Sequence, residues 1–302
     1  MLAGERDTAH ARPALRFGVI SDIQYADMPD GASHSGVPRY YRAALDSLQR
    51  AVAAWQPLDL QFVIHLGDII DGWNPKDRAS STLDVLVQEF DRLGKPHYHI
   101  MGNHCLYNLE RGALNERLRM GDASSASYYS LMPAAAILDE RNPNAEKNSP
   151  EGLVGVARRF VKFGGGASDA QMAWLQAQLS NAGNAGERVI VCSHLPLHPD
   201  TCVGTCLIWN YEEVLRVLQA AGNVVATFAG HTHRDGYARD ECGIHHRVLQ
   251  GVVETLPGVD CFGVCEAYGD RLEFRGAGSL GSATYPFRSA ASSSAGAAAA
   301  LA

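Results

Sequence analysis

The stretch Phe62-Val63-Ile64-His65-Leu66-Gly67-Asp68-Ile69-Ile70-Asp71-Gly72 decides the fold prediction. Its first half is apolar and rich in β-branched residues, which is typical of a buried strand. The run breaks at Gly67, and two aspartates, Asp68 and Asp71, follow. We therefore expect a buried strand that presents acidic side chains in a crevice at its carboxyl end.

Four other stretches have the same order, an apolar run followed by residues that can bind a metal. They end in Asp22 and Gln24, in Asn103 and His104, in His194, and in His231 and His233. We expect all five strand ends to meet in one metal site. Oxygen and imidazole ligands without thiolates suit Mn, Fe, Zn or Mg better than a soft metal. Asp68, at the head of the central turn, is best placed to bridge two cations.

Composition describes an ordinary globular chain. It has 302 residues, 46% of them hydrophobic and 20% charged, with a formal net charge of −7. This acidity, and the absence of a long Lys/Arg run, argue against a nucleic-acid polymer as partner. No apolar stretch approaches the roughly 20 residues that span a bilayer, so we predict no membrane partner. Seven scattered cysteines favour a reducing compartment, and we predict a cytoplasmic protein.

The order of elements predicts an α/β fold. We expect strands at 15–20, 98–104, 127–130 and 156–163 and within the stretches 62–72, 189–194 and 224–233, and helices at 39–55, 81–93, 109–118, 168–181 and 211–221. Ser168 or Asp169 should cap the fourth helix. Short runs at 245–250, 261–268 and 271–276 suggest antiparallel strands that close a sheet. We predict one domain over residues 14–285, with 1–13 and 289–302 disordered and a surface loop at 141–150.

These motifs resemble, in type and order, those of the calcineurin-like metallophosphoesterases. The chain is most similar to the manganese-dependent ADP-ribose/CDP-alcohol diphosphatases among them. The motifs that carry the resemblance are Asp22-Ile23-Gln24-Tyr25, Arg39-Tyr40-Tyr41-Arg42, Gly67-Asp68-x-x-Asp71, Gly102-Asn103-His104, His194, Leu207-x-Trp209-Asn210-Tyr211, Gly230-His231-Thr232-His233, Gly243-Ile244-His245-His246 and Gly251-Val252-Val253-Glu254-Thr255.

The resemblance implies a four-layer sandwich, two mixed β-sheets flanked by helices, with two divalent metal ions. Manganese is expected first, with Mg, Fe or Zn as alternatives. One ion would be held by Asp22, Gln24, Asp68 and His233, and the other by Asp68, Asn103, His194 and His231.

The resemblance also implies the catalytic residues. His104, oriented by Asp71, would donate a proton or a hydrogen bond to the leaving oxygen, and imidazole is suited to this at neutral pH. Arg39 is the candidate for binding the second phosphate, since a guanidinium matches phosphate oxygens in bidentate fashion. Two departures stand out: Cys105 replaces a usual acidic residue, and Gln24, where most of the superfamily has His, is a weaker ligand.

Other conspicuous residues are given structural roles. We expect His97, His99, His245 and His246 to be structural histidines and His65 to be a buried, hydrogen-bonded core residue. Cys202 and Cys206 favour a structural pair over a separate zinc site, because nothing nearby completes four ligands. Trp209, Tyr107 and Tyr40 are expected to be core aromatics rather than stacking surfaces for a base.

The predicted reaction is hydrolysis of the diphosphate of ADP-ribose or a CDP-alcohol to a nucleoside monophosphate and a phosphorylated product. A small, nucleotide-type substrate is the expected partner. A cyclic-nucleotide phosphodiesterase or a phosphomonoesterase would use the same ligands with a different pocket. A metal-bound scaffold that docks a protein is the non-enzyme alternative. The intact His104 and the complete ligand set argue against the scaffold.

Overall fold

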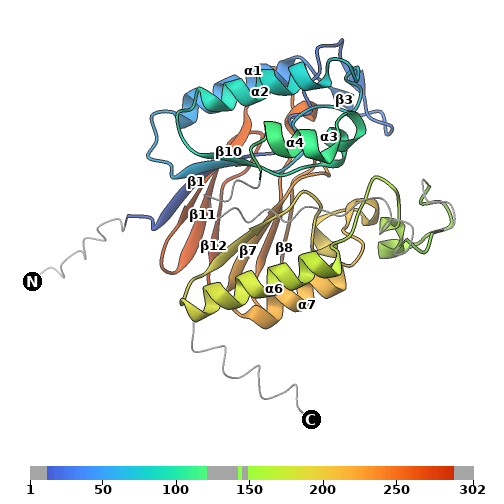
Figure 1. The fold of residues 1–302 in the computed structure, drawn as a ribbon. Coiled ribbons are helices and arrows are strands. Elements are labelled where there is room, and N and C mark those ends of the chain that lie inside the picture. Colours follow the sequence, from blue (N-terminus) through green and yellow to red (C-terminus); the bar gives the residue numbers. More distant parts are fainter. Residues whose placement is uncertain (1–11, 121–141, 145–148, 289–302) are drawn as a thin grey trace, which may run out of the picture.

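The computed structural model of this chain describes residues 12–120, 142–144 and 149–288. Within these residues two mixed β-sheets lie in the middle of the molecule and helices lie outside them (Figure 1). The predicted α/β fold with two mixed sheets flanked by helices is confirmed. No helix among the described residues is long and apolar enough to cross a membrane.

The first sheet contains the strand of the opening motif, β4 (Phe62–His65). Its strand order is β12-β11-β10-β1-β4-β5. β4 lies parallel to its two neighbours, whereas β10, β11 and β12 add antiparallel strands to the other side of β1. The other strands of this sheet are β1 (Leu15–Ile20), β5 (His97–His99), β10 (Cys261–Ala267), β11 (Arg271–Gly278) and β12 (Ala283–Pro286).

The second sheet has the strand order β6-β7-β9-β8. β7 is parallel to both of its neighbours, and β8 is antiparallel to β9. The four strands are β6 (Val189–Cys192), β7 (Val224–Ala229), β8 (Gly236–Arg239) and β9 (His245–Val248). Phe228 of this sheet belongs to the same buried apolar cluster as Val19 and Val63 of the first sheet, so the two sheets share a core.

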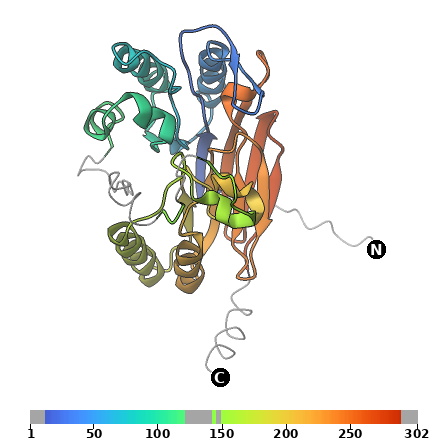
Figure 2. The ribbon, with the colours of Figure 1, turned by 90° about the vertical axis from the view of Figure 1, so that its right-hand side faces the viewer.

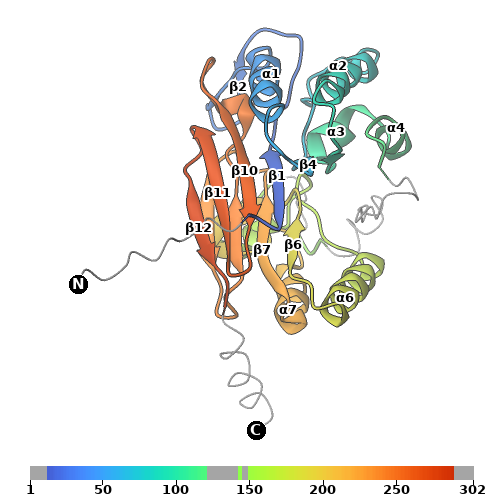
Figure 3. The same ribbon diagram turned by 90° about the vertical axis from the view of Figure 1, so that its left-hand side faces the viewer.

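The helices divide into two groups. Figures 1 and 2 show α1 to α4 on the side of the first sheet, and α6 and α7 on the side of the second. Figure 3 gives the same division from the opposite side. Trp55 at the end of α1 donates its indole N–H to the carbonyl oxygen of Gly263 in the first sheet, at 3.2 Å. The helices are α1 (Ala43–Trp55), α2 (Ala79–Asp91), α3 (Asn103–Asn108), α4 (Arg111–Arg117), α6 (Asp169–Asn184) and α7 (Tyr211–Ala221).

Helix α6 begins as predicted. Ser168 caps it, and the side chains of Ser168 and Gln171 form a reciprocal capping box with each other's backbone N–H groups. Helix α1 begins at Ala43 rather than at 39. Pro38 and Arg39 pair with Gly31 and Ala32 as the short strands β3 (Pro38–Arg39) and β2 (Gly31–Ala32) instead.

Two predicted strands are helical in the structure. β5 ends at His99, and Asn103 and His104 are the first residues of α3 rather than the end of a strand. The predicted strand at 156–163 contains no strand residue: its first part belongs to a 3-10 helix, η1 (Gly155–Arg159), and the rest is irregular. The Arg159 side chain donates to the carbonyl oxygen of Trp209 at 2.6 Å, a tertiary contact that holds η1 in place. β8 and β12 were not predicted, because runs of four residues show little periodicity.

The other short elements are η2 (Pro199–Thr201), η3 (Gly204–Cys206) and η4 (Val252–Glu254). The predicted strand at 127–130, half of the loop at 141–150, and the two termini predicted to be disordered lie outside the described residues, apart from residues 12 and 13. The prediction of one domain over 14–285 stays a prediction.

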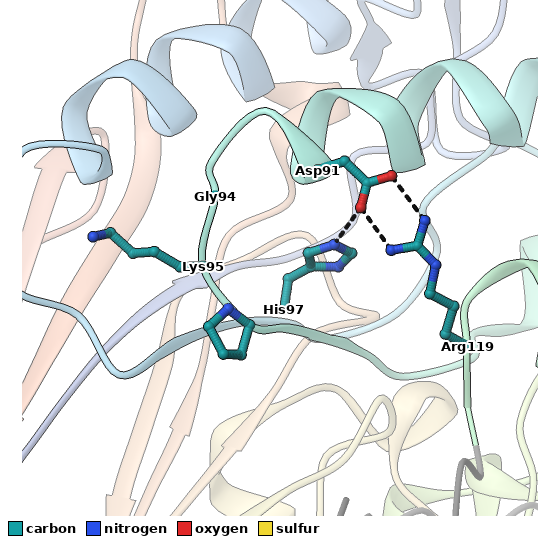
Figure 4. Close-up of a pocket in the computed structure, with 6 residues that line it drawn as sticks. Asp91, Gly94, Lys95, His97 and Arg119 are labelled. Carbon is teal, nitrogen blue, oxygen red and sulfur yellow. Dashed lines mark hydrogen bonds and ion pairs between the residues drawn. The ribbon is translucent and has the colours of Figure 1, made fainter. Parts of the chain in front are cut away.

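Four histidines have structural contacts, as expected. His245 lies 2.8 Å from the Tyr237 hydroxyl, and His246 lies 2.9 Å from the Thr227 hydroxyl. His97 contacts His99 through Nδ1 at 2.9 Å and Asp91 through Nε2 at 3.0 Å. Figure 4 shows Asp91 in a pocket in which Arg119 donates to both of its carboxylate oxygens and His97 contacts one of them. Both oxygens of this carboxylate therefore have partners.

The expectation for His65 is wrong in one respect. Its ring is buried, but neither ring nitrogen has a hydrogen-bond partner among the residues that the structure describes. Burial therefore lowers the pKa of His65 to about 4 and keeps the ring neutral at physiological pH. Cys202 and Cys206 are separate free thiols rather than a bonded pair.

Candidate dinuclear metal centre

Backbone hydrogen bonds join the loops that carry the predicted ligands. The N–H of Asp22 donates to the carbonyl oxygen of Gly67 at 3.1 Å, which connects the loops after β1 and β4. The N–H of Gly230 donates to the carbonyl oxygen of His194 at 3.0 Å, which connects the loops after β6 and β7. The N–H of His231 donates to the carboxylate of Asp22 at 2.9 Å and so joins the two sheets at the site.

The backbone of the site is strained in a consistent way. Six described residues other than glycine have a positive φ, and five of them are predicted metal ligands: Asp22, Gln24, Asp68, His231 and His233. Such left-handed conformations are uncommon in residues with a side chain and persist where surrounding structure enforces them. These backbone conformations place five predicted ligand side chains at the same site. Their conformational cost is therefore consistent with a functional role for the site.

Two glycines of the motifs allow the ligands to approach one another. A Cβ atom at Gly67 would collide with the ring of His194, and one at Gly102 would collide with the carboxylate of Asp68. Any larger residue at either position would push apart two ligand side chains. The glycine that precedes Asp68 and the one that precedes Asn103 are therefore requirements of close packing around the site.

One group of ligand atoms surrounds Nε2 of His194. Asp68 Oδ2, Asn103 Oδ1 and His231 Nδ1 each lie 3.2 Å from this nitrogen. The Nδ1–H of His194 donates to the carbonyl oxygen of Leu66 at 2.9 Å, which leaves the Nε2 lone pair free for a cation. The ligand atoms of Asp68, His194 and His231 lie within 4.8 Å of one another.

A second group adjoins the first through Asp68. Nε2 of His233 lies 3.4 Å from Oδ1 of Asp22 and 2.9 Å from the amide nitrogen of Gln24. The same amide nitrogen lies 3.2 Å from Oδ2 of Asp68. The structure thus brings together all seven predicted ligands in the two predicted groups, with Asp68 common to both.

The charges of the site are strongly coupled. Burial opposes protonation of His194 and His233, but the carboxylates beside them outweigh it and raise the pKa of each to about 9. Burial and the neighbouring His194 lower the pKa of His231 to about 3. Burial alone would raise the pKa values of Asp22 and Asp68, yet the adjacent histidines lower both below the usual value. Both aspartates therefore remain ionised.

The donor set fits two divalent cations. Imidazole nitrogens with carboxylate and amide oxygens suit manganese and related ions. The Oε1 atom of Gln24 is buried without a hydrogen-bond partner among the described residues. Buried polar atoms are normally satisfied. An amide oxygen left without a partner, in a residue that contacts Asp68 and His233, indicates a site built for cations.

We expect manganese affinity to fall as the pH is lowered from about 9 to about 6.5. The pKa values of His194 and His233 are raised to about 9, so both rings hold protons at neutral pH when no metal is bound. A cation must displace those protons, which costs about tenfold in affinity per pH unit for each proton. Titration calorimetry with Mn²⁺ at several pH values checks this. A manganese affinity that does not change with pH over that range would contradict it.

His104 lies beside the ligand groups with its Nδ1 turned away from them. Nδ1 lies 3.1 Å from Asp71 Oδ2 and accepts the N–H of Gly72, also at 3.1 Å. The backbone N–H of His104 donates to Oδ1 of Asp68 at 2.8 Å, so this residue is fixed relative to the shared ligand.

Three residues that contact the predicted ligands were not assigned to the site from the sequence. Glu254 contacts His233 and Arg39. Ser21 donates its hydroxyl to Asp22 at 2.5 Å. The hydroxyl of Tyr107 accepts from the side-chain nitrogen of Asn103 at 2.9 Å, which directs the Asn103 oxygen toward His194. Glu254 belongs to one of the motifs that carry the family resemblance, but nothing in the sequence spacing indicated that it contacts His233 and Arg39.

The remaining predicted residues are in place with some differences. The guanidinium of Arg39 lies between two carboxylates, with Nη1 3.5 Å from Asp71 and Nε 3.2 Å from Glu254. Trp209 is buried, as expected of a core aromatic. Tyr107 is instead 48% exposed, with its ring centre 5.3 Å from that of His104, so the expectation of a core residue is wrong here.

Comparison with known proteins agrees with this geometry. A model of the calcineurin-like phosphoesterase family matches residues 15–235. A rice (Oryza sativa subsp. japonica) protein named manganese-dependent ADP-ribose/CDP-alcohol diphosphatase is 42% identical over 90% of this chain and 95% of its own length. A human protein of the same name is 36% identical over 87% of this chain and 90% of its own length.

Solved structures give the same result. A dimetal phosphatase from Danio rerio superposes with a TM-score of 0.82 at 34% identity and covers 91% of this chain and 100% of that one. A purple acid phosphatase from yellow lupin, at 13% identity and a TM-score of 0.54 over 90% of this chain and 53% of that one, shares the fold alone. The chain therefore belongs to the calcineurin-like phosphoesterase family, in the branch of the manganese-dependent ADP-ribose/CDP-alcohol diphosphatases.

Proposed function

We propose that this protein is a manganese-dependent phosphohydrolase that cleaves the diphosphate of ADP-ribose or CDP-alcohols. The products are a nucleoside monophosphate and a phosphorylated remainder. The observation that carries the proposal is the convergence of seven ligand side chains in two groups that share Asp68, with His104 beside them. Relatives that match about 90% of this chain carry the corresponding name.

Two divalent cations, when bound, would polarise a phosphoryl oxygen and lower the pKa of an attacking water. The residues of this chain supply the rest. Asp68 lies between the two ligand groups and so would contact both ions. In its protonated form His104 would donate the Nε2 proton to the leaving oxygen and become neutral, and the carboxylate of Asp71, 3.1 Å from Nδ1, would stabilise the cationic ring before the transfer.

Arg39 stays a prediction as a phosphate ligand. Its side chain is largely buried between Asp71 and Glu254, and both contacts hold the guanidinium near His104. A cation at this place would attract the second phosphate of a diphosphate while the first phosphate is attacked. A phosphomonoester has no second phosphate, so a requirement for Arg39 would favour the diphosphatase over the phosphomonoesterase alternative.

We also propose a cytoplasmic location. The support comes from the sequence, in which seven cysteines are scattered without the compact spacing of a disulfide framework. Imaging of the tagged full-length chain tests this location, and a secreted or organellar signal would contradict it.

The decisive experiment compares substrates on metal-stripped protein. ADP-ribose, CDP-choline, 2′,3′-cyclic AMP and p-nitrophenyl phosphate are each incubated with Mn²⁺ or Mg²⁺, and the products are separated by chromatography. We expect AMP and CMP from the diphosphates, with turnover that depends on Mn²⁺. Cleavage of the cyclic nucleotide or the monoester alone would support the alternative enzymes. No turnover of any substrate would favour the scaffold.

A further inference from the structure

Glu254 connects two parts of the site that the mechanism treats separately. Its Oε1 lies 2.8 Å from Nδ1 of His233, the nitrogen that faces away from Asp22. The same oxygen lies 3.2 Å from Nε of Arg39, and the side chain is only 10% exposed. Because Arg39 also contacts Asp71, the contacts form a continuous chain from His233 to the partner of His104.

The backbone holds Glu254 in place independently of these contacts. It ends the short helix η4, in which Val252 and Val253 donate their N–H groups to the carbonyl oxygens of Ser21 and Asp22, at 3.2 and 3.1 Å. The carbonyl oxygen of Val253 accepts the N–H of Tyr40, next to Arg39, at 2.7 Å. The segment is therefore attached on one side to a ligand loop and on the other to the strand that carries Arg39.

The residue that precedes η4 is also adapted to His233. A Cβ atom at Gly251 would come within 2.8 Å of the His233 ring and 3.1 Å of the Asp22 side chain. The imidazole thus has Gly251 close to its Cγ and Cδ2 atoms and Glu254 at its Nδ1. In this orientation Nε2 is directed toward Asp22 and Gln24.

We propose that Glu254 is a positioning residue that orients His233 as a metal ligand and Arg39 beside Asp71. A carboxylate that accepts the second N–H of a metal-binding histidine fixes its tautomer and increases its basicity. Here the same oxygen also contacts the guanidinium of Arg39. One side chain therefore fixes the orientation of the metal ligand His233 and the position of the Arg39 side chain. This inference rests on the proposed function.

The test measures manganese binding directly, without substrate. Metal-stripped wild type, Glu254→Ala and Glu254→Gln are titrated with Mn²⁺ by calorimetry. We expect the alanine variant to lose about 10- to 100-fold in affinity for one of two ions. The glutamine variant should lose less, because its amide oxygen can still accept from His233. An alanine variant with wild-type affinity, or a glutamine variant as impaired as the alanine one, would overturn the proposal.

Glu266 provides a matched control. This residue lies on β10, and its side chain is 2% exposed and paired with Arg16 of β1 and Arg275 of β11. It contacts none of the ligands named above. Glu266→Ala removes a buried, arginine-paired carboxylate of the same type. We expect its manganese affinity to equal that of the wild type. An equal loss in Glu266→Ala and Glu254→Ala would mean that the effect is general destabilisation, and the positioning role would be wrong.

A double-mutant cycle tests the connection to Arg39. With saturating Mn²⁺, kcat/KM for ADP-ribose is measured for Arg39→Met, Glu254→Ala and the double variant. If Glu254 positions Arg39, the arginine substitution should cost clearly less in the Glu254→Ala background than in the wild type. Simple additivity would contradict the connection. Wild-type protein that binds Mn²⁺ but turns over no diphosphate would instead contradict the proposed function and leave the binding result for His233 unaffected.

Discussion

The variant Asp68→Asn is expected to lose about 1000-fold or more in kcat/KM for ADP-ribose. Among the predicted ligands, only Asp68 is placed in both groups. Bound cations contribute several kcal/mol of transition-state stabilisation, and each loss of about 1.4 kcal/mol lowers the rate tenfold. Asparagine keeps the size of the side chain and tolerates the positive φ of 57° at this position. The fold should therefore survive while the charge shared by the two ions is lost.

Steady-state kinetics with Mn²⁺ and a binding titration check this result. The control is Asp240→Asn, which neutralises another nearly buried carboxylate, 3.6 Å from His246 in the second sheet and in contact with none of the predicted ligands. We expect the control to retain both activity and manganese binding. An Asp68→Asn enzyme within tenfold of the wild type would show that this residue does not bridge two ions.

The second large effect is expected for His104→Ala. Loss of a general acid costs about 100- to 10,000-fold in turnover. Because the ring is not placed among the ligands, manganese affinity should stay near that of the wild type, in contrast to Asp68→Asn. The loss should be much smaller for a phosphodiester with a p-nitrophenyl leaving group, since a stabilised phenolate departs without a proton.

A comparison of leaving groups therefore identifies the role of His104. The ratio of wild-type to variant kcat is measured for ADP-ribose and for bis(p-nitrophenyl) phosphate under the same conditions. Equal losses on both substrates would mean that the imidazole does not protonate the leaving oxygen. A large loss of manganese affinity would instead place His104 among the metal ligands.

Much of the site could be predicted because its chemistry is local in the chain. Asp68 follows a β-branched run and a glycine, and His231 and His233 follow another such run, so strand and ligand are specified by adjacent residues. The metal-binding residue types are also few. The sequence alone therefore indicated the candidate ligands, the order of the loops, most strand positions and two helices, predicted at 168–181 and 211–221 and found at 169–184 and 211–221.

Tertiary structure decided what depends on contacts between distant segments. Asn103 and His104 begin a helix, in which the backbone N–H of His104 donates to the carboxylate of Asp68, and Arg39 lies in a short strand because it pairs with Gly31. Glu254 acquires its neighbours only when η4 is hydrogen-bonded to the Asp22 loop. Left-handed backbone at five ligands likewise requires the packed surroundings that enforce it. Local pattern thus indicated the candidate ligands, and long-range packing determined how their side chains are oriented.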